Sequence, residues 1–332
     1  MTQRFIDRFL TSSLEDRFRM AVDPTNAPAL IDYFGMPAYQ EYVDLAQRGL
    51  AELDQQHLAG EPPVSVIVLP GIMGSTIVAD SGDLYWLNKL RLDRLNKLAL
   101  AADGCSDLDL RLQFAACGLL WVYDPLLTPQ VWGPAELGYT THAYDWRKSL
   151  RLGTDALRRQ VLDVHASNGG RAVHLLGHSM GGLLIRATLM EHGDELWDKL
   201  GRIVFVATPH YGSPKLAAFL KFHLWIAELQ MRVLGVFLKR TTFRSLWGAI
   251  GLLPAPVGVY PGTRRDGSQR WQSGDSDDQY QHPCASFDLY DALNWELLLT
   301  KKELAHLQLV LEDARAFHIA LYDHHMGLDQ DL

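Results

Sequence analysis

The turn around Ser179 constrains the fold more than any other part of this chain. An apolar run at 172–176 leads into Gly177-His178-Ser179-Met180-Gly181, and a segment of helical character, 180–192, follows it. A serine on so tight a turn between strand and helix projects its hydroxyl above the sheet, and the flanking glycines relieve crowding where the helix packs back. The pattern is typical of a nucleophile elbow. It predicts that Ser179 is a covalent nucleophile and that Gly177 and Gly181 support its turn.

Other short apolar runs suggest the rest of the sheet. Residues 64–69 are a β-branched run, too short for a helix and bounded by prolines, which predicts a buried strand. Further strands are expected at 139–144 and 202–207, and a helix at 154–165 that ends at the turn Asn168-Gly169-Gly170. This alternation predicts an α/β fold with a mostly parallel sheet and helices on both of its faces.

Helical segments are expected on either side of this α/β region. Residues 1–60 are predicted to form an N-terminal helical cover, because 13–16 have the capping-box pattern and 37–58 repeat apolar residues at helical spacing. Residues 61–332 would then form the main domain. Near its end, Thr300 to Glu303 opens a second strongly periodic helix.

A cap insertion is predicted at about 215–287. Its first part, 215–260, is rich in aromatic residues, and its later part, 264–281, is polar and is expected to be a loop. In one interpretation the aromatic residues are the core of a small helical subdomain. In the other, some of them line an acyl pocket or make peripheral contact with a membrane.

Composition excludes several classes of protein. The chain has 332 residues, of which 48% are hydrophobic, so a sizeable core is expected. A net charge of -8 with dispersed Lys and Arg argues against a nucleic-acid partner. The N-terminus lacks the features of a signal peptide, and prolines and glycines interrupt the longest uncharged stretch, 245–263, so a cytoplasmic protein without a transmembrane segment is predicted.

The cysteines do not indicate a metal site, and no cofactor is expected. Cys105, Cys117 and Cys284 are too few and too scattered for a metal site or a disulfide framework. A bridge between Cys105 and Cys117 stays open as an alternative, while buried free thiols are the preferred interpretation.

An acyl-transfer serine needs two backbone N–H donors for its oxyanion. Such enzymes take one donor from the residue after the nucleophile and one from the loop after an earlier strand. Met180 is the first candidate. The second is Ile72, in the glycine-containing loop 70–75 that follows the predicted strand 64–69.

Four segments in this order resemble the lecithin:cholesterol acyltransferase-like branch of the α/β-hydrolases, which includes bacterial lipases and phospholipases. They are VSVIVLPGIMGS (64–75, which includes Ser65), AYDWR, HLLGHSMGG and ATPHYGSP, and a tryptophan, Trp86, follows the first of them. The resemblance covers about 61–220 and implies an α/β-hydrolase fold. It also implies that Asp145 and Arg147, in the second segment, give buried support and do not catalyse.

The C-terminal part departs from that family. Family members carry an acidic loop, typically Gly-Asp-Gly-Thr-Val, beyond the cap, followed by a strand and the histidine, and neither pattern occurs here. The candidates in this chain are Asp288 or Asp291 as the acid and His318, His324 or His325 as the base; His178 and His210 lie beside the motifs but are not favoured as bases. The expected explanation is that part of the sheet, with the acid and the histidine, is missing, so both are left unknown.

Two functions follow from these observations. The first is a serine hydrolase or acyltransferase, a lipase or esterase that acts on lipid or other carboxylic esters through an acyl-enzyme on Ser179. The alternative is a catalytically incompetent α/β-hydrolase-like module that binds an acyl ligand or a partner chain. For the first function, an additional C-terminal segment or a partner chain is the expected source of the acid and the histidine.

Overall fold

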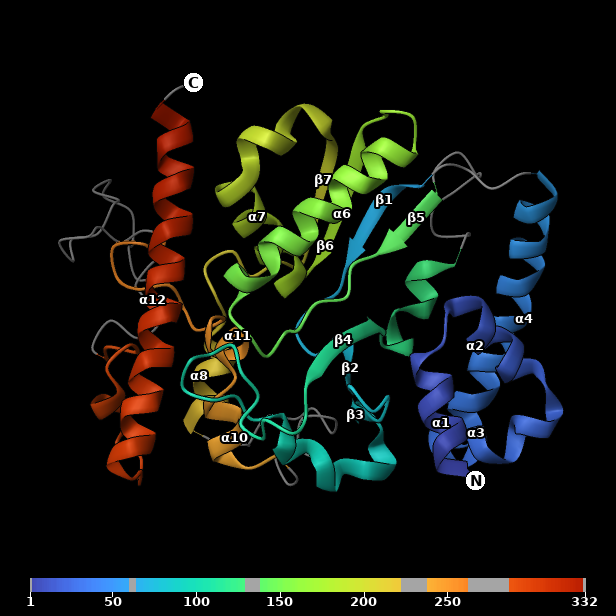
Figure 1. Ribbon diagram of the computed structural model, residues 1–332, viewed down its shortest axis with the longest axis horizontal. Coiled ribbons are helices and arrows are strands. Elements are labelled where there is room, and N and C mark those ends of the chain that lie inside the picture. The colour runs from blue at the N-terminus through green and yellow to red at the C-terminus, as the bar shows by residue number, and fades with distance from the viewer. Residues whose placement is uncertain (1, 60–63, 129–137, 222–237, 262–286, 331–332) are drawn as a thin grey trace, which may run out of the picture.

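A four-stranded parallel sheet lies at the centre of the molecule (Figure 1). The computed structural model describes residues 2–59, 64–128, 138–221, 238–261 and 287–330. The sheet has the order β5-β1-β6-β7, with β1 at Val64–Leu69, β5 at Gly138–Thr141, β6 at Val173–His178 and β7 at Leu200–Val206. The strand predicted at 64–69 is confirmed to the residue. The α/β class with a mostly parallel sheet is confirmed as well.

The two faces of the sheet are covered by different parts of the chain. Helices α6 (Thr154–Ser167) and α7 (Met180–Leu196) pack on one face, where Ile67 and Leu69 of β1 point into the main core. Val66 and Val68 point to the other face and pack against the short helix η3 (Trp121–Leu127). Burial on both faces explains why β1 is a continuous apolar run without alternation.

A second, antiparallel sheet has the order β3-β2-β4 and was not predicted. Its strands are β2 at Ser75–Ala79, β3 at Leu84–Trp86 and β4 at Phe114–Leu119. β2 begins directly after the loop 70–75 and pairs with β4, with Ser75 opposite Leu119. The small sheet therefore fixes the far end of the predicted oxyanion loop.

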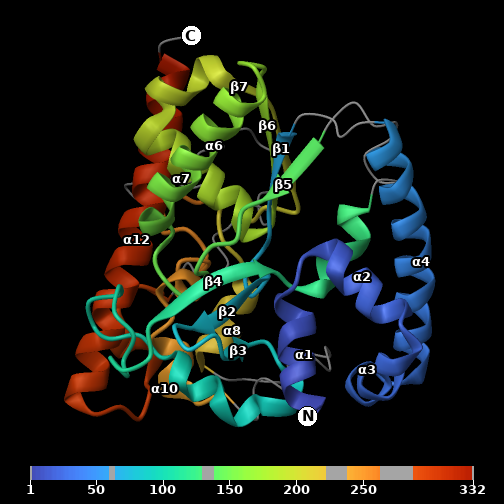
Figure 2. The same ribbon diagram turned by 45° about the vertical axis from the view of Figure 1, so that its right-hand side comes forward.

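The N-terminal helices form a bundle with its own apolar cluster. They are α1 (Thr2–Thr11), α2 (Leu14–Val22), η1 (Pro24–Asn26), α3 (Ala27–Phe34) and α4 (Met36–Ala59). The predicted cap at Ser13 is confirmed, because its hydroxyl accepts from the Asp16 N–H at 3.2 Å. Two views of the ribbon place this bundle on the side of the sheet opposite α6 and α7 (Figures 1 and 2).

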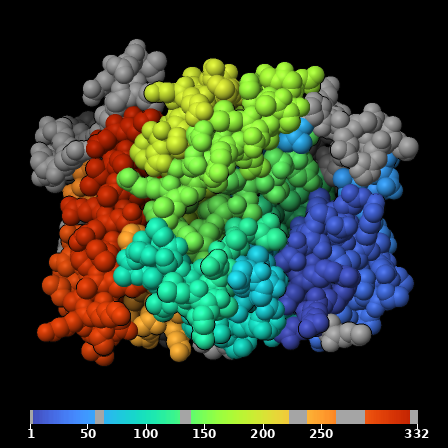
Figure 3. Space-filling model, viewed as in Figure 1, coloured from blue at the N-terminus to red at the C-terminus, as the bar shows by residue number. Residues whose placement is uncertain are grey.

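The last helix packs at the other end of the molecule. Helix α12 (Lys301–Gln330) lies beside α7, and the main domain separates it from the N-terminal bundle (Figure 3). Its predicted capping box is present, since the Thr300 N–H and hydroxyl both donate to Glu303 at 2.8 Å. The remaining short helices are η2 (Lys89–Leu98), η4 (Leu150–Gly153), η5 (Trp197–Lys199) and η7 (Ala292–Trp295).

The predicted cap insertion is described only in part. Its described residues form α8 (Pro214–Lys221), α10 (Arg240–Arg244) and α11 (Trp247–Ile250), which pack against one another and the main core. The predicted polar loop 264–281 and Cys284 lie outside the described residues. Within those ranges, no helix is both long and apolar enough to cross a membrane.

The preferred interpretation of the first two cysteines was wrong in one respect. Cys105 and Cys117 are free thiols, so the alternative of a bridge between them is excluded, but both are exposed and not buried. Cys117 lies on β4, where exposed and half-buried residues alternate. The sequence around it did not reveal this strand, and its exposure was missed for the same reason.

A buried histidine on α12 makes the stability of the fold depend on pH. His318 is almost fully buried, and burial lowers its pKa from 6.5 to about 4. In the unfolded chain, His318 is protonated when the pH falls below about 6.5. In the folded chain, it is protonated only below about pH 4. We expect the free energy of unfolding to fall by up to about 3 kcal/mol between pH 7 and pH 4 from this group.

Denaturant titrations at several pH values test this, with His318→Gln as the comparison. In the variant, the free energy of unfolding should fall less steeply below pH 6.5, because the contribution of His318 is absent. An equally steep decline in the variant would show that other groups are responsible.

Candidate active site

Ser179 occupies a strained turn between β6 and α7. Its φ is 51° and its ψ is -121°, a region that costs energy for any residue with a side chain. Met73 and Ala207, which follow β1 and β7, also have positive φ values. Three strained residues thus follow the carboxyl ends of three adjacent parallel strands, the edge at which sheets of this kind bind ligands.

The neighbouring glycines allow the backbone to pack this closely. A Cβ added at Gly181 would lie 2.5 Å from the Pro70 carbonyl oxygen, and one added at Gly71 would lie 2.9 Å from the Ser179 Cβ. A Cβ at Gly177 would meet the first turn of α7 at 2.7 Å. The structure therefore brings the predicted elbow and the predicted oxyanion loop into direct contact.

Ile72 and Met180, the predicted oxyanion donors, flank this contact. Ile72 follows Gly71 in a turn that the bond from the Gly74 N–H to the Gly71 carbonyl oxygen closes at 3.0 Å. Met180 is buried at the first position of α7, where backbone N–H groups lack an intrahelical acceptor. Among the described residues, neither amide donates to a backbone acceptor.

Aromatic side chains hold the loop 70–75 in place. The Tyr144 hydroxyl donates to the Pro70 carbonyl oxygen at 2.9 Å, and the Trp86 indole N–H donates to that of Met73 at 2.8 Å. The Trp146 indole N–H donates to the Ser75 carbonyl oxygen at 3.2 Å, and the two tryptophan rings pack edge to face. The AYDWR segment and Trp86 thus support the site by fixing this loop.

Tyr123, on η3, is a site residue that sequence reasoning missed. Its hydroxyl accepts from the Gly71 N–H at 2.7 Å and lies 2.8 Å from the His178 Nδ1. Because the hydroxyl accepts from Gly71, its own hydrogen is available to Nδ1, which leaves the His178 proton on Nε2. Burial lowers the pKa of His178, which favours this neutral form.

Removing the Tyr123 hydroxyl is expected to destabilise the site. Tyr123→Phe leaves the buried Gly71 N–H without its acceptor, and we expect the free energy of unfolding to fall by about 1–3 kcal/mol. Denaturant titration measures the change. Tyr39→Phe is the matched control, because its hydroxyl makes only a long bond of 3.5 Å to the Ala21 carbonyl oxygen. Equal stability of the two variants would contradict the assigned role of Tyr123.

The candidate acids and bases are not brought to Ser179. Asp288 and Asp291 accept from backbone N–H groups two residues ahead, each at 2.9 Å. His318 is buried within α12, and His324 and His325 lie further along the same helix. Among the described residues, no histidine or carboxylate forms a hydrogen bond with the Ser179 hydroxyl.

His210, within the ATPHYGSP segment, makes contacts with residues other than Ser179. Its ring packs edge to face on Phe205, and its carbonyl oxygen accepts from Arg186 at 3.2 Å. Burial, with the nearby Arg186 charge, lowers the pKa of His210. The geometry gives no reason to treat this histidine as a base.

Arg147 makes the supporting contacts that the family resemblance implied. It is fully buried and donates to Asp145 through Nε at 2.9 Å and to Asp107 through Nη1 at 2.7 Å. Its guanidinium also lies over the Phe114 ring. The AYDWR segment is thereby tied to the loop before β4.

Comparisons with known proteins find one family and two individual proteins to which this chain is similar. Residues 130–246 match the family model described as lecithin:cholesterol acyltransferase. Phospholipase A(1) LCAT3 of Arabidopsis thaliana is 30% identical over 84 residues, which make up 25% of this chain but only 18% of that protein. One chain in the crystal structure of the Tle4-Tli4 complex superposes with a TM-score of 0.49 and 16% identity, over 80% of this chain and 73% of that one.

The parallel sheet and the strained serine turn define an α/β-hydrolase fold. The matched residues 130–246 include the elbow, the AYDWR segment and the ATPHYGSP segment. Through them the chain is similar to the lecithin:cholesterol acyltransferase family, as the motifs predicted.

Proposed function

We propose that the protein is a serine esterase or acyltransferase that acts on lipid or other carboxylic esters. In this reaction the Ser179 Oγ attacks the ester carbonyl carbon, the alcohol leaves, and water or an alcohol acceptor takes the acyl group from the enzyme. The Ile72 and Met180 N–H groups donate to the oxyanion. The observation that carries this proposal is the strained Ser179 turn, packed directly against the loop that holds Ile72.

The exposed strand β7, at the outer edge of the parallel sheet, suggests where the unassigned acid and base are supplied. Within the described residues β7 pairs only with β6. Its residues Val204, Phe205 and Val206 are 45%, 39% and 42% exposed, which is unusual because strands of parallel sheets are normally buried on both faces. We propose that a further segment, of a longer chain or of a partner, pairs with β7 and supplies the acid and the histidine.

Hydrogen exchange tests the state of this edge. In the chain alone, the amides of β7 should exchange faster than those of β6, because the described residues provide β7 with neither apolar cover nor a second neighbouring strand. Peptide-resolved exchange measured by mass spectrometry reads both strands in one experiment. Equal, slow exchange would mean that the edge is already covered and that no segment is needed.

The alternative is a catalytically incompetent module that binds an acyl ligand or a partner chain. The exposed β7 edge and the unassisted Ser179 hydroxyl favour it, whereas the strained turn and the ordered loop 70–75 do not. Hydrolysis of 4-nitrophenyl butyrate and of phosphatidylcholine separates the two functions. Turnover that disappears in Ser179→Ala supports the esterase. A folded chain that turns over neither substrate, and whose Ser179 is also not modified by excess alkyl fluorophosphonate, supports the binding module.

A further inference from the structure

A large cavity lies away from the Ser179 turn. It has a volume of about 720 Å³, is partly open to solvent, and is lined by the loop after η2, by α10 and by the first turns of α12. No residue of the elbow or of the loop 70–75 lines it. Its size falls within the range of roughly 300–1,000 Å³ that is usual for small-molecule sites.

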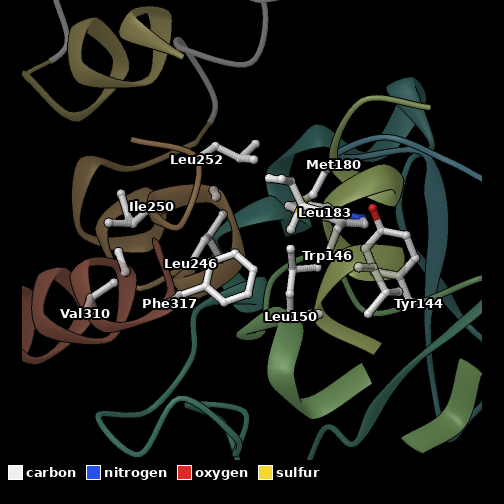
Figure 4. Close-up of a cluster of buried hydrophobic side chains, with 14 of the residues drawn as sticks. Tyr144, Trp146, Leu150, Met180, Leu183, Leu246, Ile250, Leu252, Val310 and Phe317 are labelled. Carbon is white, nitrogen blue, oxygen red and sulfur yellow. The ribbon is translucent and has the colours of Figure 1, made fainter. Parts of the chain in front are cut away.

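Buried side chains fill the space between α7 and the helices α11 and α12 (Figure 4). Met180 and Leu183 meet Trp146 on one side, and Leu246, Ile250 and Phe317 lie on the other. A ligand in the cavity would therefore touch different residues from those that a substrate on Ser179 would touch.

Much of the cavity wall is apolar. Leu100 and Leu307 are buried in it, while Leu108 and Leu309 line it and remain substantially exposed. Two leucines that remain exposed to water do not stabilise the fold. An alkyl chain that bound in the cavity would cover them.

A buried arginine, Arg244, lines the cavity. Arg244 is only 8% exposed, and its Nε has no hydrogen-bond partner among the described residues. Its Nη2 makes one long bond of 3.4 Å to the Leu220 carbonyl oxygen. Burial and the Arg240 charge lower the pKa of Arg244, and Glu303 raises it. A guanidinium in this position is costly unless an anion compensates it.

Other polar groups at the cavity fit the same kind of ligand. Lys239 and Lys302 line it, as does His306, whose buried Nε2 also has no partner among the described residues. Glu303 is the acidic residue in the lining, and its carboxylate already accepts from Thr300. Burial lowers the pKa of His306, so this side chain is a neutral partner. The two lysines and Arg244 beside an apolar wall match a carboxylate or phosphate head group on an alkyl tail.

We propose that this cavity binds an anionic amphiphile with a single alkyl chain, whose head group pairs with Arg244 and His306 and whose chain lies along Leu100, Leu108, Leu307 and Leu309. The head group is a carboxylate, as in a fatty acid, or a phosphate, as in a lysophospholipid. The site is separate from Ser179 and does not depend on the proposed esterase activity.

Calorimetric titration of the whole chain tests the proposal with four probes. Dodecanoate and dodecyl phosphate distinguish the two head groups, dodecanol lacks a charge, and inorganic phosphate lacks a chain. We expect at least one of the two anionic amphiphiles to bind more tightly than both dodecanol and inorganic phosphate. Binding of phosphate alone, or of dodecanol as tightly as the anions, would overturn the proposal.

Arg244→Gln locates the site. It should weaken binding of the anionic amphiphile by about tenfold or more and leave dodecanol unchanged. Without ligand, its melting temperature should equal or exceed that of the wild type, because a buried charge that Glu303 compensates only in part is removed.

Two controls complete the design. Arg159→Gln, on the exposed surface of α6, should bind the amphiphile like the wild type, and so should Ser179→Ala. Unchanged binding in Arg244→Gln, or loss of binding in Ser179→Ala, would overturn the proposal. So would a lower melting temperature of Arg244→Gln with unchanged affinity, because Arg244 would then serve only the fold.

Discussion

Replacing Asp124 with alanine is expected to lower the free energy of unfolding by about 3–5 kcal/mol, as for other buried pairs that lose one partner. Asp124 is fully buried on η3. Its carboxylate accepts from the Nε of Arg17 at 2.9 Å, and also from the Arg17 Nη2 and the Tyr42 hydroxyl. The alanine variant leaves the guanidinium of Arg17 buried without a counter-charge.

This cluster also connects the N-terminal bundle to the site. Arg17 lies on α2 and Tyr42 on α4, while Asp124 directly follows Tyr123, which binds Gly71 and His178. We therefore expect Asp124→Ala to loosen the N-terminal helices together with the loop 70–75.

Denaturant titration measures the change in stability, and Asp155→Ala is the matched control. Asp155 pairs with Arg158 and Arg159 on the exposed surface of α6, so its removal should change the free energy of unfolding by no more than about 1 kcal/mol. If Asp124→Ala unfolds at the same denaturant concentration as the control, the buried pair does not have the role given to it here.

Trp146→Ala is expected to have a similarly large effect, about 3–5 kcal/mol, because it opens a large cavity in the main core. Trp146 is 1% exposed, packs on Trp86 with ring centroids 5.0 Å apart, and lies among Met180 and Leu183 (Figure 4). Its loss would also free the Ser75 carbonyl oxygen, so the oxyanion loop should become more mobile.

Trp197→Ala is the control for this variant. Trp197 is 71% exposed on η5, and its removal should change stability by no more than about 0.5 kcal/mol. Trp146→Phe separates packing from hydrogen bonding, since it keeps most of the apolar volume and loses the bond to Ser75. A similar stability of Trp146→Ala and Trp197→Ala would contradict the packing described here.

The parallel sheet could be predicted because its signals are local. Residues 64–69 are β-branched and bounded by prolines, and the fold buries them on both faces, so the continuous apolar run was sufficient. The antiparallel sheet was missed because β3 has only three residues and β4, FAACGL, contains alanines and a glycine, which have little preference for strands.

In the candidate site, too, residues within local motifs could be predicted, whereas residues brought there by long-range packing could not. Ser179, Gly71 and Gly181 follow from short motifs whose geometry is set by neighbouring residues. Tyr123 lies 52 residues from Gly71 and 55 from His178, and no motif surrounds it, so only the packing of η3 against the sheet reveals its role. The acid and the histidine could not be assigned, because the sequence has no family motif for them and, within the ranges that the structure describes, no contact with Ser179 identifies them.

The central claim is that Ser179 is the nucleophile that forms an acyl-enzyme. Prolonged incubation with excess alkyl fluorophosphonate, followed by intact-protein and peptide mass spectrometry, tests it most directly. The excess compensates for the absence of a base bonded to Ser179 among the described residues. We predict a single phosphonyl adduct on the peptide that contains Ser179 and no adduct in Ser179→Ala. A folded wild-type chain that remains unmodified, or an adduct that persists in Ser179→Ala, would contradict the claim.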